Sequence, residues 1–145
     1  MYFHIETQNL MTVPQGYTLA HCISADCALG AGVAKQIDEA YDMRATLKKG
    51  AEQIKGGIPW PSCVGVSNVM NLVTKERCFH KPTLDSLREA LTQMRIAVEK
   101  YNIKKIAMPK IGCGLDRLDW EDVEPMIHEI FDDLDIEIMV CVLPD

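Results

Sequence analysis

The pattern of apolar and polar positions predicts a chain in which strands and helices alternate. Short apolar runs bounded by turn residues predict strands at Tyr2–Thr7, Tyr17–Ile23, Ile103–Met108 and Ile136–Leu143. Two further runs, residues 63–66 and 69–73, either pair as a hairpin around Ser67 and Asn68 or form one bulged strand.

Helical spacing of apolar residues predicts four helices between these strands. The first covers residues 30–41 and buries Val33, Ile37 and Tyr41, and the second covers residues 43–54. The clearest helix begins at Pro82, a residue well suited to a first helical position, and ends at Asn102. Its apolar stripe consists of Leu84, Leu87, Leu91, Met94, Val98 and Tyr101. The last helix covers about residues 122–134, has Pro125 in its first turn, and buries Val123, Ile127, Ile130 and Phe131.

This alternation predicts one α/β domain over residues 1–145, a three-layer α/β/α fold with a central mixed, largely parallel sheet. In such sheets ligands bind beyond the carboxyl ends of the strands. The loops after Ile23, Val73 and Pro109 lie at that edge if their strands are parallel.

Composition and charge narrow the classes of partner. The chain has 145 residues, 48% of them apolar and 25% charged, as expected of a soluble domain. It has no apolar run long enough to span a bilayer and its first residues lack a secretory pattern, so we expect cytoplasmic residence with reduced thiols and no membrane partner. A net charge of −6 argues against a broad nucleic-acid surface, but loop N–H groups can still bind a small anion.

The most informative segment is residues 108–118 (MPKIGCGLDRL), where an apolar strand leads into a glycine-rich loop and then an acidic helix start. Glycines allow close approach of the backbone to a ligand, and helix N-termini favour anions. Residues 21–32 (HCISADCALGAG) and 74–83 (TKERCFHKPT) form similar strand-to-helix transitions. Three such loops can converge on one phosphorylated ligand.

Two charged residues of these loops, Lys75 and Asp116, could have either a purely structural role or a role in catalysis. Lys75 ends a mostly apolar run, so it is either an ordinary surface lysine or a partly desolvated amine whose neutral form can attack a sugar carbon. Asp116 is a helix cap, a partner of Arg117, or a free general base. Asp119 and Asp122 lie nearer the helix and can cap it, which favours the last interpretation.

Thiol and metal chemistry are alternatives that the sequence favours less. Cys113 lies between two glycines, but no neighbouring sequence feature supplies a base for a thiol nucleophile. We expect Cys22 in the core and His80 in a structural role. A zinc site formed by Cys22, Cys27, Cys78 and His80 would have poor ligand spacing, so we predict no metal.

Taken together, the three loops resemble those of the terminal ADP-ribose protein glycohydrolase branch of the macrodomain family, and the similarity extends over nearly the whole chain. The resemblance implies Lys75 and Asp116 as the catalytic residues. It also implies three groups of ligand-binding residues. The loop around the distal ribose and diphosphate consists of Lys110, Ile111, Gly112, Cys113, Gly114 and Leu115. The other wall of the site consists of Ser24, Gly30, Ala31 and Gly32, and the adenosine end consists of Asn9, Leu10 and Leu143. The family usually has an aspartate where this chain has Asn9, whose amide oxygen can still accept from adenine but carries no charge.

The resemblance also implies an activity. Members of this branch bind ADP-ribose, release it from acidic side chains of proteins and deacylate O-acyl-ADP-ribose, without a cofactor or a metal. We therefore expect a monomeric hydrolase whose partners are ADP-ribose and ADP-ribosylated proteins. The alternatives are a hydrolase acting on ADP-ribosylated DNA bases, a non-catalytic ADP-ribose reader, and an enzyme that depends on Cys113.

Overall fold

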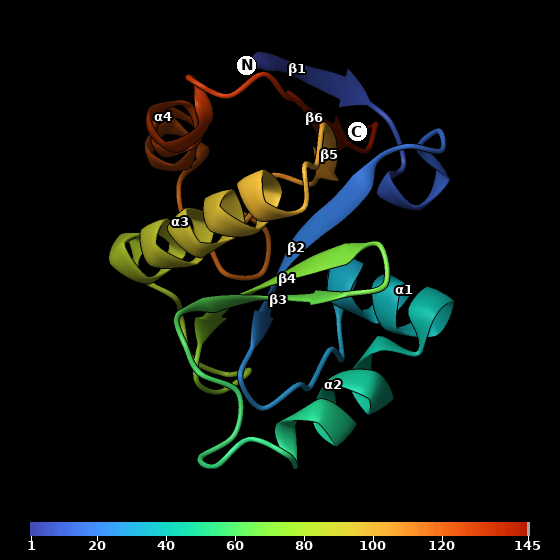
Figure 1. Cartoon of the computed structure of the whole chain (residues 1–145), viewed down its shortest axis with the longest axis vertical. Coiled ribbons are helices and arrows are strands. Elements are labelled where there is room, and N and C mark those ends of the chain that lie inside the picture. The colour runs from blue at the N-terminus through green and yellow to red at the C-terminus, as the bar shows by residue number, and fades with distance from the viewer. Residues whose placement is uncertain (145) are drawn as a thin grey trace.

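Six strands form one mixed sheet in the order β1-β6-β5-β2-β4-β3 (Figure 1). The computed structural model describes residues 1–144, and its strands are β1 (Tyr2–Thr7), β2 (Thr18–Ser24), β3 (Ser62–Val66), β4 (Val69–Lys75), β5 (Lys105–Met108) and β6 (Glu137–Val142). Every neighbouring pair is parallel except β3 and β4, which are antiparallel. The predicted three-layer fold with a largely parallel sheet is confirmed.

Two helices cover each face of the sheet (Figure 1). α1 (Gly32–Tyr41) and α2 (Met43–Ala51) lie on one face, α3 (Leu84–Lys100) and α4 (Trp120–Phe131) on the other, and a short 3-10 helix, η1 (Leu10–Thr12), follows β1. Because strand side chains alternate, Ala20 packs into the α3/α4 core, whereas Leu19 and Ile23 pack into the α1/α2 core. The central strand β2 is therefore buried on both faces.

Between β3 and β4 the structure selects the hairpin. Val66 pairs with Val69, and Ser67 in the turn has φ 51°, a left-handed conformation that tight hairpin turns require.

The start of α3 differs from the prediction. The helix begins at Leu84 rather than Pro82, because Thr83 is the N-cap and exchanges hydrogen bonds with Ser86 in a capping box. Its end also differs, because Tyr101 lies past the last helical turn and is 67% exposed. Tyr101 therefore does not belong to the buried stripe.

Helix α4 starts and ends earlier than predicted. It runs from Trp120 to Phe131, so Pro125 lies inside the helix and not in its first turn. A proline at this position removes one backbone hydrogen bond of the helix. The apolar residues predicted to face inward are nevertheless all buried. Within residues 1–144, no helix is both long enough and apolar enough to cross a membrane.

An ionisable cluster joins the edge strand β1 to β6, away from the loops described below. His4 contacts Glu6 and Glu137 at 2.8 Å through its two ring nitrogens, and the Tyr17 hydroxyl donates to Glu137. Burial alone would lower the pKa of His4, but the hydrogen bonds and charges of Glu137 and Glu6 outweigh it and raise the pKa. The Glu137 hydrogen bond and burial raise the pKa of Tyr17 to about 12, while hydrogen bonds from Tyr17 and His4 lower the pKa of Glu137.

This cluster predicts a pH-dependent stability. Because the folded-state pKa of His4 is raised, its contribution is complete below the unfolded pKa of about 6.5 and is lost as pH rises through the folded value. We expect His4→Gln to reduce the free energy of unfolding by a few tenths to about 1 kcal/mol at pH 5.5, and much less at pH 9. Urea denaturation at both pH values measures this, since Glu137 and Tyr17 titrate outside that window. An equal reduction at both values would contradict it.

Candidate active site

A cavity of about 790 Å³ lies beyond the carboxyl ends of β2, β4 and β5, where the three glycine- and polar-rich loops meet. The loop after β2 contributes residues 28–34 and the loop after β4 contributes residues 78–81. The loop after β5 contributes residues 109–112 and 114–117. The predicted convergence of three loops on one site is thus present.

The register of the central strands sets two of the walls side by side. β2 and β4 shift register at Ile23 and Ser24, so that Ser24 lies opposite Lys75. Beyond the strands the pairing continues, since Ala25 N–H donates to the Lys75 carbonyl at 2.9 Å and Asp26 N–H to that of Glu76 at 3.2 Å. Lys75 is therefore fixed at its backbone.

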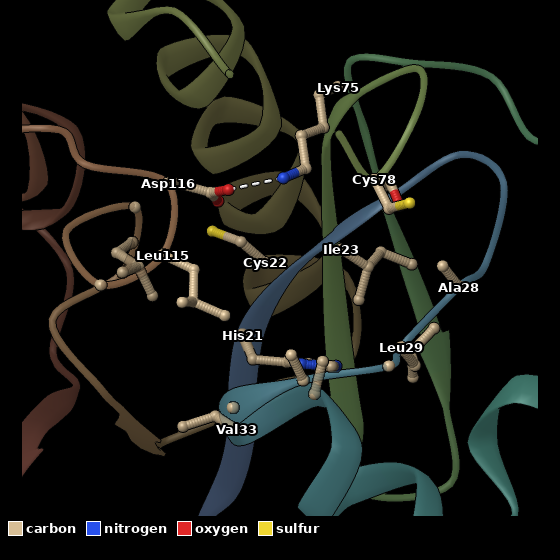
Figure 2. A pocket seen from close by; sticks show the side chains of 18 of the residues that line it. His21, Cys22, Ile23, Ala28, Leu29, Val33, Lys75, Cys78, Leu115 and Asp116 are labelled. Carbon is tan, nitrogen blue, oxygen red and sulfur yellow. Dashed lines mark hydrogen bonds and ion pairs between the residues drawn. The ribbon is translucent and has the colours of Figure 1, made fainter. Parts of the chain in front are cut away.

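Lys75 and Asp116 form an ion pair inside the cavity. The Lys75 Nζ lies 2.6 Å from the Asp116 Oδ1, and each side chain is 14% exposed. Figure 2 shows the two side chains pointing toward one another from β4 and from the loop after β5. Asp116 is neither a helix cap nor bonded to Arg117. The N-cap of α4 is Asp119, although its side chain makes no capping hydrogen bond.

The loop after β5 is a compact turn that places Asp116. Gly112 has φ +73°, and its carbonyl accepts from Leu118 N–H at 2.7 Å, which closes the loop. A Cβ on Gly112 would lie 3.0 Å from Leu118 Cδ1 and 3.3 Å from Leu87 Cδ2. Glycine is required here both by the left-handed backbone and by the packing beneath it.

The cavity attracts anions although the chain is acidic. Counted over the described residues 1–144, its lining holds four cationic side chains and one carboxylate, whereas the whole chain carries −6. These are Lys75, Lys81, Lys110 and Arg117, and Asp116. The N-terminus of α1, at Gly32, adds the positive end of its helix dipole. Its N-cap residue, Ala31, has no side chain that could satisfy the first N–H groups of the helix.

Most of the predicted ligand residues line this cavity. They are Ser24, Gly30, Ala31, Gly32, Lys110, Ile111, Gly112, Gly114 and Leu115, together with Lys75 and Asp116. Four others do not line it, namely Asn9, Leu10, Cys113 and Leu143. Asn9 caps η1, its Oδ1 accepting from Met11 N–H at 2.9 Å, while Leu10 is buried and Leu143 is 66% exposed. Their roles at the adenosine end stay predictions.

The geometry of the cysteines argues against thiol catalysis. The Cys113 Sγ lies 3.4 Å from the carbonyl of Ile111, and burial raises its pKa to about 11. Cys22, which we expected in the core, lines the cavity floor below Asp116 (Figure 2). Burial and the charge of Asp116 raise the pKa of Cys22, so both thiols are neutral at neutral pH. Within residues 1–144, no three His, Cys, Asp or Glu side chains are placed to hold a metal ion.

Sequence reasoning missed Asp26, which ties two cavity walls together. Its carboxylate accepts from the Ser24 hydroxyl, from Ala28 N–H at 3.2 Å and from Cys78 N–H at 2.9 Å. Burial would raise the pKa of Asp26, but these hydrogen bonds lower it. The pairing between residues 26 and 78 is tertiary, and no spacing in the sequence indicates it.

His21 is a second missed residue of the cavity lining. It is 1% exposed, its Nε2 lies 2.5 Å from Asn71 Oδ1, and burial lowers its pKa to about 4. The imidazole is therefore neutral at neutral pH and cannot supply a charge to a ligand.

Comparison with known proteins identifies the family and the fold. The Macro domain profile matches residues 20–127. Human "ADP-ribose glycohydrolase OARD1" is 38% identical over 135 residues, which cover 93% of this chain and 88% of the human protein. The "DNA ADP-ribosyl glycohydrolase" of Thermus aquaticus is 25% identical over 91% of this chain, but that match covers only 39% of the Thermus protein.

A solved structure gives the same result for the fold. The macrodomain of Mycobacterium tuberculosis DarG superimposes with a TM-score of 0.86 at 22% identity, covering 99% of this chain and 98% of that one. The α/β/α sandwich with its site beyond the parallel strands is thus a macrodomain fold. This chain belongs to the Macro domain family.

Gly112 allows a test of the loop that carries Asp116. We expect Gly112→Ala to destabilise the protein by about 1–3 kcal/mol, because alanine would be strained at φ +73° and would collide with Leu118. Gly114→Ala is the matched control, since a Cβ there meets nothing within 4 Å, and it should change stability by less than about 0.5 kcal/mol. Chemical denaturation of the two variants measures the difference, and equal values would show that the loop is not constrained at Gly112.

Proposed function

We propose that this macrodomain is an ADP-ribose glycohydrolase that releases ADP-ribose from acidic side chains of proteins and deacylates O-acyl-ADP-ribose. The observation that carries the proposal is the 2.6 Å contact between the Lys75 amine and the Asp116 carboxylate inside an anion-attracting cavity. A reader of ADP-ribose would need the glycine loops but not this pair. The similarity to the human ADP-ribose glycohydrolase supports the glycohydrolase part of the proposal.

The pair can supply a nucleophile and a base. Asp116 first accepts a proton from the Lys75 ammonium of the ion pair, which leaves a neutral amine. This amine attacks the anomeric carbon of the distal ribose, and a C–N bond forms as the bond from that carbon to the acyl oxygen breaks. The acceptor carboxylate leaves with the bonding electrons, and the new C–N nitrogen gives up a proton to the ring oxygen. The sugar ring then opens to an imine on Lys75, and water hydrolyses it to free ADP-ribose and the amine. Each step uses groups of this chain and water, so the proposal includes no cofactor.

The placement of other groups supports the binding step. The free N-terminus of α1 and Lys110 lie on opposite walls and can both attract the diphosphate. Gly114, where a Cβ would meet nothing within 4 Å, allows the ribose to approach the backbone of the loop after β5. We propose ADP-ribosylated proteins as the macromolecular partners and a monomer as the working form.

Lys75 provides the decisive test. We expect Lys75→Ala to lose at least about 10³-fold in turnover of glutamate-linked ADP-ribose, as removal of a nucleophile does, while ADP-ribose binding survives. Lys49→Ala, on the exposed face of α2, is the matched control and should keep full activity. Asp116→Ala should lose turnover and part of the binding. Release of free ADP-ribose and the ADP-ribose-dependent thermal shift measure the two effects.

Two results would redirect the proposal. If Lys75→Ala hydrolyses at the wild-type rate, Lys75 is not the nucleophile. If the wild type binds ADP-ribose but cleaves no protein-linked, DNA-linked or O-acyl substrate, the chain is a reader. A slow Asp116 variant that accumulates one ADP-ribose on Lys75, located by peptide mapping, would support the covalent route directly.

A second candidate is hydrolysis of ADP-ribose from DNA bases. The cationic lining of the cavity and the similarity to the DNA ADP-ribosyl glycohydrolase of Thermus aquaticus favour it. The overall charge of −6 weighs against it, because DNA binding requires a basic surface that displaces the counterions condensed on the DNA phosphates. Parallel assays with glutamate-linked and thymidine-linked ADP-ribose separate the two functions.

Asn9 predicts a weakened adenine contact. An aspartate at this position would add charge to the hydrogen bond with the adenine amino group, and charged acceptors form bonds about twice as strong. We expect Asn9→Asp to tighten ADP-ribose binding by about three- to tenfold, and to leave ribose 5-phosphate binding unchanged. Calorimetry with both ligands measures this. Equal changes for both would remove Asn9 from the adenine site.

A further inference from the structure

A large aromatic side chain is exposed at the rim of the cavity. Phe79 lines the same cavity as Lys75 but is 80% exposed, and the proposed function gives it no role. It lies in a turn formed by residues 77–80, in which His80 N–H donates to the Arg77 carbonyl at 3.0 Å. The His80 Nδ1 accepts from Arg77 N–H at 3.3 Å, and the His80 ring packs edge-on against Phe79 at 4.7 Å.

The 77–80 turn is held in place by the neighbouring loop after β2. Asp26 Oδ2 accepts from Cys78 N–H, and Asp26 N–H donates to the Glu76 carbonyl. A surface aromatic on a fixed backbone loses little conformational entropy when it binds a partner. The position of Phe79 is therefore preorganised.

Phe79 has cationic residues near it in the sequence, and the loop after β5 adds another to the cavity lining. Arg77 and Lys81 lie two residues to either side of Phe79, and Arg117 lines the facing loop. Across the described residues 1–144, none of the three belongs to an ion pair. Unpaired cations beside an exposed aromatic suit a ligand that has both negative charge and an apolar side chain.

We propose that the 77–80 turn binds the polypeptide to which ADP-ribose is attached, with Phe79 contacting an apolar side chain and Arg77 and Lys81 contacting acidic residues next to the modified one. This inference rests on the proposed function. Lys75 must reach the anomeric carbon, so the acceptor leaves the cavity beside Lys75. The 77–80 turn begins two residues after Lys75. Phe79 would thus determine specificity without taking part in the chemistry.

Charge favours a short acidic peptide over a nucleic acid as the partner. The modified carboxylate is neutralised by its ester, so the cations are left for neighbouring acidic residues. A polynucleotide would extend its phosphates beyond the rim, over a protein whose net charge is −6. A short acidic peptide needs cationic side chains only at the rim of the cavity.

The experiment compares substrates with and without a polypeptide. We expect Phe79→Ala to raise KM for an acidic peptide ADP-ribosylated on glutamate by about five- to tenfold, as loss of an aromatic contact does, with kcat unchanged. O-acetyl-ADP-ribose, which lacks a peptide, should be hydrolysed with unchanged kinetics. Tyr101→Ala removes an aromatic that is 67% exposed but lies outside the cavity lining, and it should affect neither substrate.

Salt separates the charged contacts from the apolar one. Arg77→Gln and Lys81→Gln should each raise the peptide KM by about two- to fivefold in 50 mM NaCl, and the effect should largely disappear in 500 mM NaCl. The effect of Phe79→Ala should persist at both concentrations. Lys49→Gln, on α2, controls for a change of net charge alone.

Three outcomes would overturn the inference. Equal loss on the peptide and on O-acetyl-ADP-ribose would place Phe79 in the ADP-ribose site. Loss only on a thymidine-linked oligonucleotide would assign the turn to nucleic acid. Unchanged kinetics on every substrate would leave Phe79 without a role.

A binding measurement keeps the test independent of catalysis. In calorimetry on the Lys75→Ala variant, which should bind without turnover, the ADP-ribosylated peptide should bind more tightly than ADP-ribose does. Adding Phe79→Ala to this variant should abolish that advantage. The comparison stands even if the wild type hydrolyses nothing, a result that would contradict the proposed function alone. Equal affinity of the Lys75→Ala variant for both ligands would contradict the inference.

Discussion

The parallel pairing of β2 with β4 on one side and β5 on the other is the constraint on which the site depends. It directs the carboxyl ends of three strands to one edge, so that their following loops meet. Lys75 and Asp116 are 41 residues apart in sequence, and this arrangement alone brings their charged atoms to 2.6 Å. The register shift between Ile23 and Ser24 also contributes to this arrangement, because it places Ser24 beside Lys75. Neither helix pair contributes a side chain to the Lys75–Asp116 ion pair. The helices bury the sheet and hold its loops in position.

Apolar periodicity predicted the sheet, the helices and the edge at which the site lies, because each depends on local patterns of burial. Helix ends were predicted less well, since they depend on hydrogen bonds of single residues. Thr83 and Ser86 start α3 after Pro82, and α4 accommodates Pro125 in its interior. Cytoplasmic residence and the monomeric state, which no contact in the structure addresses, stay predictions.

The candidate site was predictable to the extent that loops carry recognisable residues. Spacing alone left Lys75 as either a surface lysine or a reactive amine and favoured Asp116 as a free carboxylate, and only the family resemblance paired the two. Asp26 and His21 were missed for a physical reason: their roles arise from tertiary contacts. The Asp26 carboxylate joins Ser24 to the backbone of Cys78 across two loops. The cationic lining of the cavity was not predictable either, because the net charge of −6 is a sum over the whole chain and does not show where the folded protein gathers its cationic side chains.

The two ends of the site differ in how firmly the structure defines them. At the distal-ribose end, Lys75 and Asp116 fix each other, and Gly112 fixes the loop behind them. At the adenosine end, the predicted recognition of adenine by Asn9 would use a side-chain oxygen that already accepts from Met11 N–H. An amide oxygen has two lone pairs and can accept a second hydrogen bond, whereas the amide nitrogen can only donate. Adenine recognition through Asn9 would therefore depend on one shared neutral acceptor, and the phosphate and ribose contacts would then supply a larger part of the affinity for ADP-ribose.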